Sequence, residues 1–452
     1  MTATATPAST ESRVGLFNRR YALATAGSTS LVFLAAFEAL AITTVMPTIT
    51  ADLDGRALYS LAFVATTATG VVGMVVSGAW ADRRGPRLAL LTAIGVFALG
   101  LAVAGTAPTM WVFVAGRLLQ GLGAGGITVA LYVLVAAVYP AALHPRIFGL
   151  FAAAWVVPSM VGPFVAGLVA DAWSWHWVFL GVLILVAAAT LVTVPVLRGA
   201  LPTGDPGAAR DGRRIAAAAV VAGGAVTAGL ASDLADARGW LLAAVAVTAV
   251  VVTVRRLLPP DTFRARPGLP AAVLLSAAAG GTFFSTEVYL PLLLHDRYGL
   301  PSWLSGFTLT VGAISWATGS HVQGRLTGWT DAKVMRLGTL FLVAGAAAEL
   351  LTALFTPHWV FVGAGWLLAG GGMGLIYPRV STLVLAASVA GTQGFNTAAK
   401  NIADVVGGSL ALAVTGLLFQ SLAGFGAWWS FAGTLTLSTL LGGAAVLVAR
   451  RV

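Results

Sequence analysis

The chain has 452 residues, of which 58% are hydrophobic and 9% are charged, and it contains no cysteine. Because a soluble domain carries about 25% charged residues, this composition excludes a water-soluble globular protein and predicts an all-α polytopic membrane protein. The lack of cysteine excludes disulfides and thiolate metal sites in the chain.

The first twenty residues are rich in Ala, Thr, Ser and Pro and end in Arg19-Arg20. They have no cleavage site after a short apolar core, so we predict a disordered cytoplasmic tail over 1–20 and not a signal peptide. Apolar runs of about 20 residues, long enough to span a bilayer, then recur along the chain. The predicted helices cover 21–46, 58–80, 88–107, 110–138, 147–170, 174–197, 215–232, 239–258, 269–294, 304–326, 335–356, 359–385, 395–419 and 427–449.

These fourteen helices form two blocks of six with a pair between them. We predict an N-terminal six-helix bundle over 21–197, a linker with two extra transmembrane helices over 198–268, and a C-terminal six-helix bundle over 269–452. A twelve-helix chain without the pair is the alternative, since its first member is short and rich in Ala and Gly. The two blocks look related, and parallel repeats of this kind are a transporter architecture.

The distribution of basic residues gives the orientation. With the N-terminus inside, the predicted cytoplasmic segments hold twenty Lys and Arg, whereas the outer loops hold only Arg56, Arg238 and Arg297. This is a strong positive-inside pattern, which places both termini in the cytoplasm of a cell whose plasma membrane the chain crosses repeatedly. The net charge of +10 is therefore topological, and nucleic acid is not an expected partner.

One acid, Glu38, lies inside the first predicted helix. A carboxylate in a bilayer costs roughly 2.5–3.5 kcal/mol even on the lenient insertion scale, so we predict a functional role and not snorkelling to the outer surface. Arg117 lies at a similar predicted depth and cannot readily lose its charge. We therefore predict that Glu38 is the partner of Arg117, either in proton traffic or in a structural ion pair.

Other charges fall within predicted helices. Glu287 lies about as far into the first helix of the second block as Glu38 does in the first, and neighbouring hydroxyls could be its partners, so we predict a proton or substrate site there. Lys400 and Asp404 are four residues apart and can pair on one helix face, with a proton relay as the alternative. We expect Glu349 to snorkel and Arg379 to be a positive-inside charge. The hydroxyls around Glu287 are those of Thr282, Ser285, Thr286 and Tyr289.

The loop after the second predicted helix reads GAWADRRGPR over 78–87. It resembles the G-x-x-x-D-R-x-G-R signature of the major facilitator superfamily. The resemblance implies a charge relay that holds the cytoplasmic side closed, formed by Gly78, Asp82, Arg83, Gly85 and Arg87. The corresponding loop of the second block has Gln323 where the acid would be, which predicts an asymmetric latch.

Three further stretches resemble motifs of this superfamily. Residues 117–125 resemble R-x-x-Q-G-x-G-x-G, in which the arginine is tied to proton transfer. Residues 149–167 resemble the motif of drug:proton exporters, with Gly149, Pro158, Gly162, Pro163 and Gly167, although Pro158 and Ala166 replace glycines. Glu38 stands nine residues before Pro47, which resembles the fourteen-helix drug:proton antiporter branch, as does Trp175-His176-Trp177.

The resemblance implies a proton-driven exporter of amphipathic or cationic small molecules that acts as a monomer. It needs a proton gradient and no cofactor or metal, and the chain has no G-x-x-x-x-G-K-[ST] loop for ATP. Sodium coupling, or a specific metabolite, lipid, sugar, siderophore or self-made antibiotic as cargo, are the alternatives. An enzyme is not expected, because H-E-x-x-H and G-x-S-x-G are absent. The aromatic side chains that could line a cargo-binding site are Phe33, Phe37, Phe283, Phe284 and Tyr289. We expect several of them only to pack in the protein core.

Overall fold

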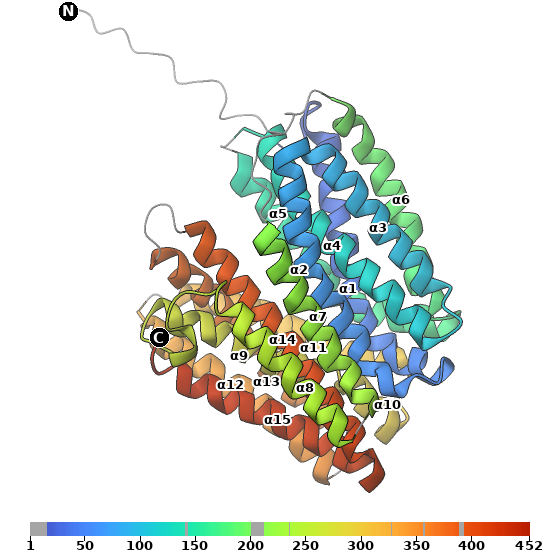
Figure 1. The fold of residues 1–452 in the computed structure, drawn as a ribbon, viewed down its shortest axis with the longest axis vertical. Coiled ribbons are helices and arrows are strands. Elements are labelled where there is room, and N and C mark those ends of the chain that lie inside the picture. Colours follow the sequence, from blue (N-terminus) through green and yellow to red (C-terminus); the bar gives the residue numbers. More distant parts are fainter. Residues whose placement is uncertain are drawn as a thin grey trace, which may run out of the picture.

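The computed structural model describes residues 16–140, 143–199, 212–234, 236–326, 328–355, 358–387 and 393–452. Within these ranges the chain is helical and contains no strand (Figure 1). The first bundle contains α1 (Ala22–Asp52), α2 (Tyr59–Arg84), α3 (Pro86–Gly105), α4 (Met110–Val138), α5 (His144–Ala172) and α6 (His176–Arg198). The linker pair is α7 (Gly212–Leu234) and α8 (Ala237–Val254). The second bundle contains α9 (Leu269–Glu287), α10 (Leu290–Tyr298), α11 (Ser302–Arg325), α12 (Asp331–Phe355), α13 (Val360–Ala386), α14 (Gln393–Leu422) and α15 (Ala427–Val448).

The predicted all-α fold with fourteen helical segments is confirmed, counting α9 and α10 together as one segment. Among the described residues, thirteen segments are long and apolar enough to cross a membrane, and both linker helices are among them. The remaining segment, α11, is 24 residues long but carries several Ser, Thr and Gly residues, a histidine and a glutamine.

The prediction ended the first helix at residue 46, but α1 continues through Pro47 to Asp52. Proline removes one backbone donor, yet the extra turn is held from outside, because Asp52 Oδ2 accepts a hydrogen bond from Trp175 Nε1 at 2.9 Å. Residues 16–20 of the predicted tail are described, and there the buried Leu16 accepts a hydrogen bond from Thr25 Oγ1 through its carbonyl oxygen at 2.9 Å. Residues 1–15 lie outside the described ranges.

The helix predicted over 269–294 is broken in the structure. α9 ends at Glu287, and α10 begins at Leu290 with Pro291 in its first turn. A proline ring clashes with the carbonyl four residues earlier, which here is that of Glu287, so an uninterrupted helix is disfavoured at this point.

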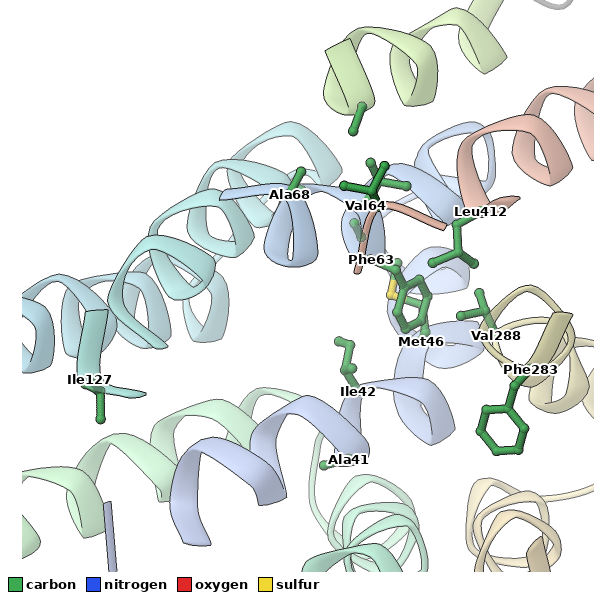
Figure 2. Packing of buried hydrophobic residues seen from close by; sticks show 14 of the residues in the cluster. Ala41, Ile42, Met46, Phe63, Val64, Ala68, Ile127, Phe283, Val288 and Leu412 are labelled. Atoms are coloured by element: carbon green, nitrogen blue, oxygen red, sulfur yellow. The ribbon is translucent and has the colours of Figure 1, made fainter. Parts of the chain in front are cut away.

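The two bundles lie side by side and meet along two seams (Figure 1). One seam is formed by α5 and α11, and the other by α2 and α14. The linker helix α7 contacts both α2 and α14, and α8 packs on α7, so the pair covers the second seam. Figure 2 shows the apolar packing between the bundles, where Met46 and Phe63 of the first lie near Val288 and Leu412 of the second.

The fourth helices of the two bundles, α4 and α13, repeat one another. Residues 116–125 read GRLLQGLGAG, and residues 365–374 read GWLLAGGGMG. A methyl carbon added at Gly125 would lie 2.1 Å from a carbonyl oxygen of α2, and one added at Gly374 would lie 2.3 Å from a carbonyl oxygen of α11. The matched glycines therefore let α4 and α13 approach equivalent neighbours, which supports the predicted relation between the blocks.

Candidate functional site

Glu38 of α1 and Arg117 of α4 form an ion pair inside the first bundle, and each side chain is only 2% exposed. The guanidinium also donates from Nη1 to Gln120 Oε1 at 2.9 Å and from Nε to the carbonyl oxygen of Ala62 in α2 at 3.3 Å. The predicted partnership is confirmed, and this burial rules out snorkelling of Glu38. One arginine thus ties α1, α2 and α4 together.

The glycine motif of α4 holds this arginine in place. Thr66 Oγ1 of α2 donates to the carbonyl oxygen of Arg117 at 3.2 Å, and Thr69 Oγ1 donates to that of Leu118 at 2.9 Å. A methyl carbon added at Gly121 would lie 2.2 Å from the carbonyl oxygen of Thr66. Close approach of α2 therefore needs glycine here, and it fixes the backbone that carries the guanidinium.

The second bundle has a different pair at the matching position. In the α4–α13 repeat, Trp366 stands where α4 has Arg117. Its ring stacks on Phe283 of α9, with centroids 4.4 Å apart, and both side chains are buried. Tyr289 is also buried, between Tyr59 and a phenylalanine of α14, so two of the five aromatics considered as cargo walls only pack, as expected.

Glu287 lies at the break between α9 and α10 and is partly exposed. Three of the four hydroxyls predicted as its partners bond elsewhere: Thr282 and Thr286 each donate to a carbonyl oxygen one turn earlier at 2.8 Å, and Ser285 bonds a serine of α15 at 2.7 Å. Each of these three hydroxyls is therefore engaged away from Glu287, two of them by the backbone of their own helix. The role of this acid as a proton or substrate site stays a prediction.

A polar triad of the buried Lys400 and Asp404 and the partly buried Tyr377 occupies the second bundle between α9, α13 and α14. Tyr377 of α13 donates a hydrogen bond to Asp404 Oδ2, and the ammonium of Lys400 lies over the Tyr377 ring, 3.6 Å from its centroid. The direct ion pair predicted between Lys400 and Asp404 does not form, because the tyrosine comes between them. The other oxygen of Asp404 faces Gly280, where a methyl carbon would lie 2.4 Å from it.

The prediction that Glu349 snorkels to the membrane surface is wrong, because its side chain is 0% exposed. It lies on α12 against Gly365 of α13, where a methyl carbon would lie 2.7 Å from its Oε1. The glycine opens the space that the carboxyl fills, and neither carboxyl oxygen has a hydrogen-bond partner among the described residues.

The loop between α2 and α3 shows why its motif needs glycine. Gly85 has φ of +80°, a conformation that side-chain-bearing residues rarely adopt, and Pro86 starts α3 directly after it. The side chain of Asp82 lies outside the described residues, Arg87 is exposed, and Arg83 Nε has no partner within the described ranges. The cytoplasmic latch therefore stays a prediction.

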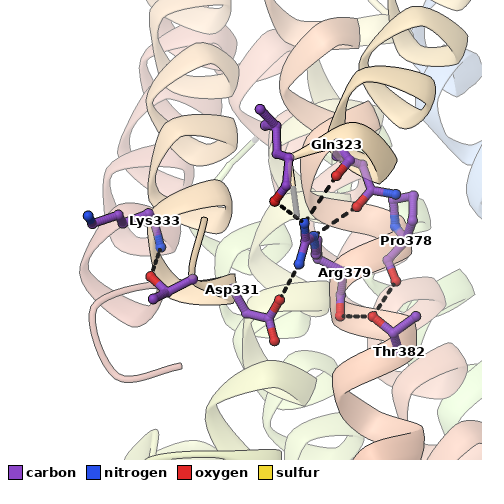
Figure 3. A network of polar contacts seen from close by, with 8 residues as sticks. Gln323, Asp331, Lys333, Pro378, Arg379 and Thr382 are labelled. Carbon is purple, nitrogen blue, oxygen red and sulfur yellow. Dashed lines mark hydrogen bonds and ion pairs between the residues drawn. The ribbon is translucent and has the colours of Figure 1, made fainter. Parts of the chain in front are cut away.

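In the second bundle, Arg379 of α13 is the centre of a polar network (Figure 3). It pairs with Asp331 Oδ1 at 2.6 Å and donates to Gln323 Oε1 at 2.9 Å and to the carbonyl oxygens of Gln323 and Leu326 at 3.0 and 3.1 Å. Arg379, interpreted from the sequence as a positive-inside charge, therefore also joins α13 to α11 and α12. The glutamine at the motif position accepts from an arginine two helices away, and sequence spacing alone did not indicate that contact.

The motif of α5 forms the seam between the bundles. The helix runs without interruption through Pro158 and Pro163. Gly162 faces α1, and Gly167 meets the backbone of Trp303 in α11, where a methyl carbon would lie 2.5 Å from its Cα. These small residues therefore allow close contact between the two bundles on one side of the molecule.

Polar contacts join the bundles near one end, where α1 finishes and α2 starts, which we call the α1–α2 end. We call the opposite end, where α2 finishes and α3 starts, the α2–α3 end. The contacts are Thr48 with Ser302 (Oγ1 to Oγ, 3.1 Å), Arg56 with Asp296, Tyr59 Oη with the carbonyl oxygen of Val288 (2.7 Å), and Asp171 Oδ2 with the backbone N–H of Trp303 (3.0 Å). These contacts hold the bundles together at the α1–α2 end.

The family model of the Major Facilitator Superfamily matches residues 29–412. The chain belongs to this superfamily. A "Probable multidrug-efflux transporter" of Mycobacterium tuberculosis is 29% identical over 407 residues, which cover 84% of this chain and 83% of that protein. A thioclapurine efflux transporter of Claviceps purpurea is 26% identical over 417 residues, covering 86% and 75% of the two chains.

Solved structures share the fold at low identity. A POT family transporter in complex with 5-aminolevulinic acid has a TM-score of 0.68 at 13% identity, with 96% of each chain covered. The family match and the relatives show that this major facilitator chain is a multi-pass membrane transporter and not an enzyme. Among the described residues no group of three or more His, Asp or Glu side chains is placed to hold a metal ion.

Proposed function

We propose that this chain is a proton-coupled antiporter that exports amphipathic or cationic small molecules across the plasma membrane by alternating access. The observation that carries the proposal is the buried pair of Glu38 and Arg117. The names of the relatives support efflux of drugs or of a natural product. The energy source is a proton gradient, and no cofactor takes part.

The coupling follows from the charge of this site. While Glu38 is ionised, it and Arg117 together are neutral. When a proton neutralises the carboxyl, the site carries one positive charge, and the guanidinium keeps Gln120 and the carbonyl of Ala62 as partners. A cationic cargo and a proton therefore disfavour one another, which is the condition for exchange.

The polar contacts at the α1–α2 end supply the gate. With the orientation that the positive-inside pattern predicts, this end faces outward, and we therefore assign the conformation described here as closed to the outside. Opening the outer face requires breaking the Arg56–Asp296 ion pair and the Thr48–Ser302 hydrogen bond. Cargo binds from the inside in this state, and protonation of Glu38 favours its release after the bundles rock.

Export of a single metabolite is the second candidate, because one relative is named for efflux of thioclapurine. The same site and gate would serve it, with a cargo-specific wall in place of a broadly selective one.

Purified protein in liposomes tests the proposal. We expect an imposed pH gradient to drive accumulation of a lipophilic fluorescent cation, and Glu38→Gln to abolish the gradient dependence while Glu287→Gln is compared alongside. Undiminished gradient dependence in both normally folded variants would overturn the proposal. A gradient of sodium in place of protons that drives the same transport would reassign the coupling ion.

A further inference from the structure

The loop between α8 and α9 encloses a hollow of about 250 Å³ at the α2–α3 end. Gly229 of α7 packs against Leu61 in the first turn of α2, so α8 starts near the α1–α2 end and runs to the opposite one. The hollow is many times larger than the roughly 30 Å³ that one water molecule occupies in the liquid, so it has room for a phosphate group. Its lining includes Arg255, Asp261, Phe263 and Arg264.

The backbone of this loop has a defined shape. Asp261 and Ala265 have φ of +64° and +48°, a region that residues with side chains rarely adopt. Between them the buried Thr262 donates from Oγ1 to the carbonyl oxygen of Pro259 at 2.7 Å. Such backbone conformations persist where the surrounding structure fixes them, so the hollow is a built part of the fold.

The C-terminal end of the chain holds the loop from outside. Arg451 donates from Nη1 to the carbonyl oxygen of Arg264 at 3.0 Å, and its own carbonyl oxygen accepts from the backbone N–H of Gly268 at 3.2 Å. The loop accordingly lies beside the C-terminus in Figure 1. These contacts use only backbone atoms of the loop, and the side chain of Arg264 stays 87% exposed.

The loop carries four exposed arginines and one acid. Asp261 is shared by two of them, since its carboxylate lies 3.6 Å from Arg264 Nη1 and 3.3 Å from Arg266 Nη1. Arg255 and Arg256 follow directly after the last turn of α8, and both are exposed. The loop therefore keeps a net charge of +3, and Arg255 and Arg264 bring part of it into the lining of the hollow.

An apolar stripe of α8 leads to the hollow along the membrane. Val245 and Val252 are 60% and 54% exposed on a helix that is long and apolar enough to span a bilayer, and Arg255 follows one turn later on the same face. The rise from Val245 to Arg255 is about 15 Å, half of the roughly 30 Å hydrocarbon core. The stripe therefore matches the acyl chains of one leaflet, and the arginine lies at the depth of their headgroups.

We propose that this hollow binds the phosphate headgroup of an anionic phospholipid of the cytoplasmic leaflet, through Arg255 and Arg264. The leaflet follows from the orientation that the positive-inside pattern predicts for the α2–α3 end. A guanidinium can donate two parallel hydrogen bonds to phosphate oxygens, and arginines near this leaflet attract anionic lipids. Phe263, 45% exposed beside them, packs on the acyl chains. The site is separate from the Glu38–Arg117 pair and needs no transport to be occupied.

Native mass spectrometry of the purified full-length protein in detergent tests the site. The probes are phosphatidylglycerol, which is anionic, and phosphatidylcholine, which is zwitterionic, with the same acyl chains. We expect wild type to bind the first phosphatidylglycerol at least roughly ten-fold more tightly than phosphatidylcholine. Arg255→Gln/Arg264→Gln should weaken the binding of phosphatidylglycerol by roughly ten-fold and leave that of phosphatidylcholine as in wild type.

Arg198→Gln/Arg325→Gln is the matched control, because it removes the same charge from exposed positions at the ends of α6 and α11, outside the lining of the hollow. It should bind phosphatidylglycerol as wild type does. Equal affinity of the two double variants, both with wild-type helix content by circular dichroism, would overturn the site. The total charge of the cytoplasmic face would then attract the lipid, or neither pair of arginines would.

Inorganic phosphate distinguishes a lipid from a free anion. Millimolar inorganic phosphate should leave phosphatidylglycerol bound, because the acyl chains add contacts along α8 that the free anion lacks. Phe263→Ser should weaken the binding of the lipid by roughly three-fold, since an exposed apolar ring is removed. Displacement of the lipid by inorganic phosphate, with Phe263→Ser binding as wild type does, would overturn the lipid and assign the hollow to a free anion.

Discussion

Arg117 has more partners than an ion pair requires. Besides Glu38, it reaches Gln120 and the carbonyl of Ala62, so three elements of the first bundle converge on one guanidinium. Arginine suits this role because its planar group donates in several directions and stays charged. The carboxyl can therefore change its charge while the arginine remains bonded.

Removing Arg117 alone should lower the free energy of unfolding more than removing both Arg117 and the charge of Glu38. We expect Arg117→Ala to destabilise the protein by roughly 3–5 kcal/mol, because it leaves a buried carboxyl without its partner. The double variant Arg117→Ala/Glu38→Gln should recover part of this loss. Thermal unfolding of the single and the double variant, followed by tryptophan fluorescence, measures the loss and its recovery.

Arg238→Ala, at an exposed position of α8, is the control and should unfold as wild type does. If Arg117→Ala and the double variant unfolded at the same temperature, the unpaired carboxyl of Glu38 would not be the cause of the destabilisation.

At the residue scale, sequence reasoning found the pair but not the surroundings of the other acids. Glu38 and Arg117 were predictable, because each is costly alone in a bilayer and both lie at similar depth. Glu349 was not, because its burial depends on Gly365 of the next helix. Tyr377 was missed altogether, since nothing in its own stretch shows that it separates Lys400 from Asp404.

At the scale of elements, glycines decide which helices touch. Gly125 and Gly374 put α4 and α13 against carbonyl oxygens of α2 and α11. The repeat GxLLxGxGxG over 116–125 and 365–374 was visible in the sequence and would have predicted both contacts. It would also have shown that the second bundle has tryptophan in place of the arginine.

We expect Gly125→Ala to lower the unfolding temperature by several degrees, because a methyl carbon there would lie 2.1 Å from a backbone oxygen that cannot move aside easily. Gly95→Ala is the matched control, since a methyl carbon in that part of α3 meets nothing within 4 Å. Alanine is the better helix former by about 1 kcal/mol, so the control should be unchanged or stabilised. Equal unfolding temperatures for the two variants would contradict the packing argument.

Arg379 ties the end of α11 to the start of α12. We expect Arg379→Gln to speed hydrogen exchange several-fold in the last turn of α11, because the carbonyls of Gln323 and Leu326 lose their donor. Arg325→Gln, at an exposed neighbouring position, should leave this exchange rate as in wild type. Exchange that is unaffected by Arg379→Gln would mean that the network does not stabilise this helix end.

At the scale of the whole molecule, the helix count and the two blocks were predictable from apolar runs and basic residues. The seams were not, because they depend on which faces of α2, α5, α11 and α14 meet. The break after Glu287 was signalled by Pro291 but was not predicted, since proline is also tolerated inside helices such as α5.

A disulfide tests the gate directly, because the chain has no cysteine of its own. The hydroxyl oxygens of Thr48 and Ser302 are 3.1 Å apart, so Thr48→Cys/Ser302→Cys should form a disulfide without large movement. We expect this cross-link to stop transport and a reductant to restore it. The single variants should transport with or without oxidant, and a cross-linked protein that still transports would show that this end does not open.

The central claim is that Glu38 exchanges a proton for cargo. The most direct measurement is the number of protons released when a lipophilic cation binds to purified protein in weakly buffered detergent solution, followed over a range of pH. The account predicts about one proton per bound cation in a range of pH for wild type, and none for Glu38→Gln at equal occupancy. Release that persists unchanged in Glu38→Gln, or no release by wild type at any pH while the cation binds, would contradict it.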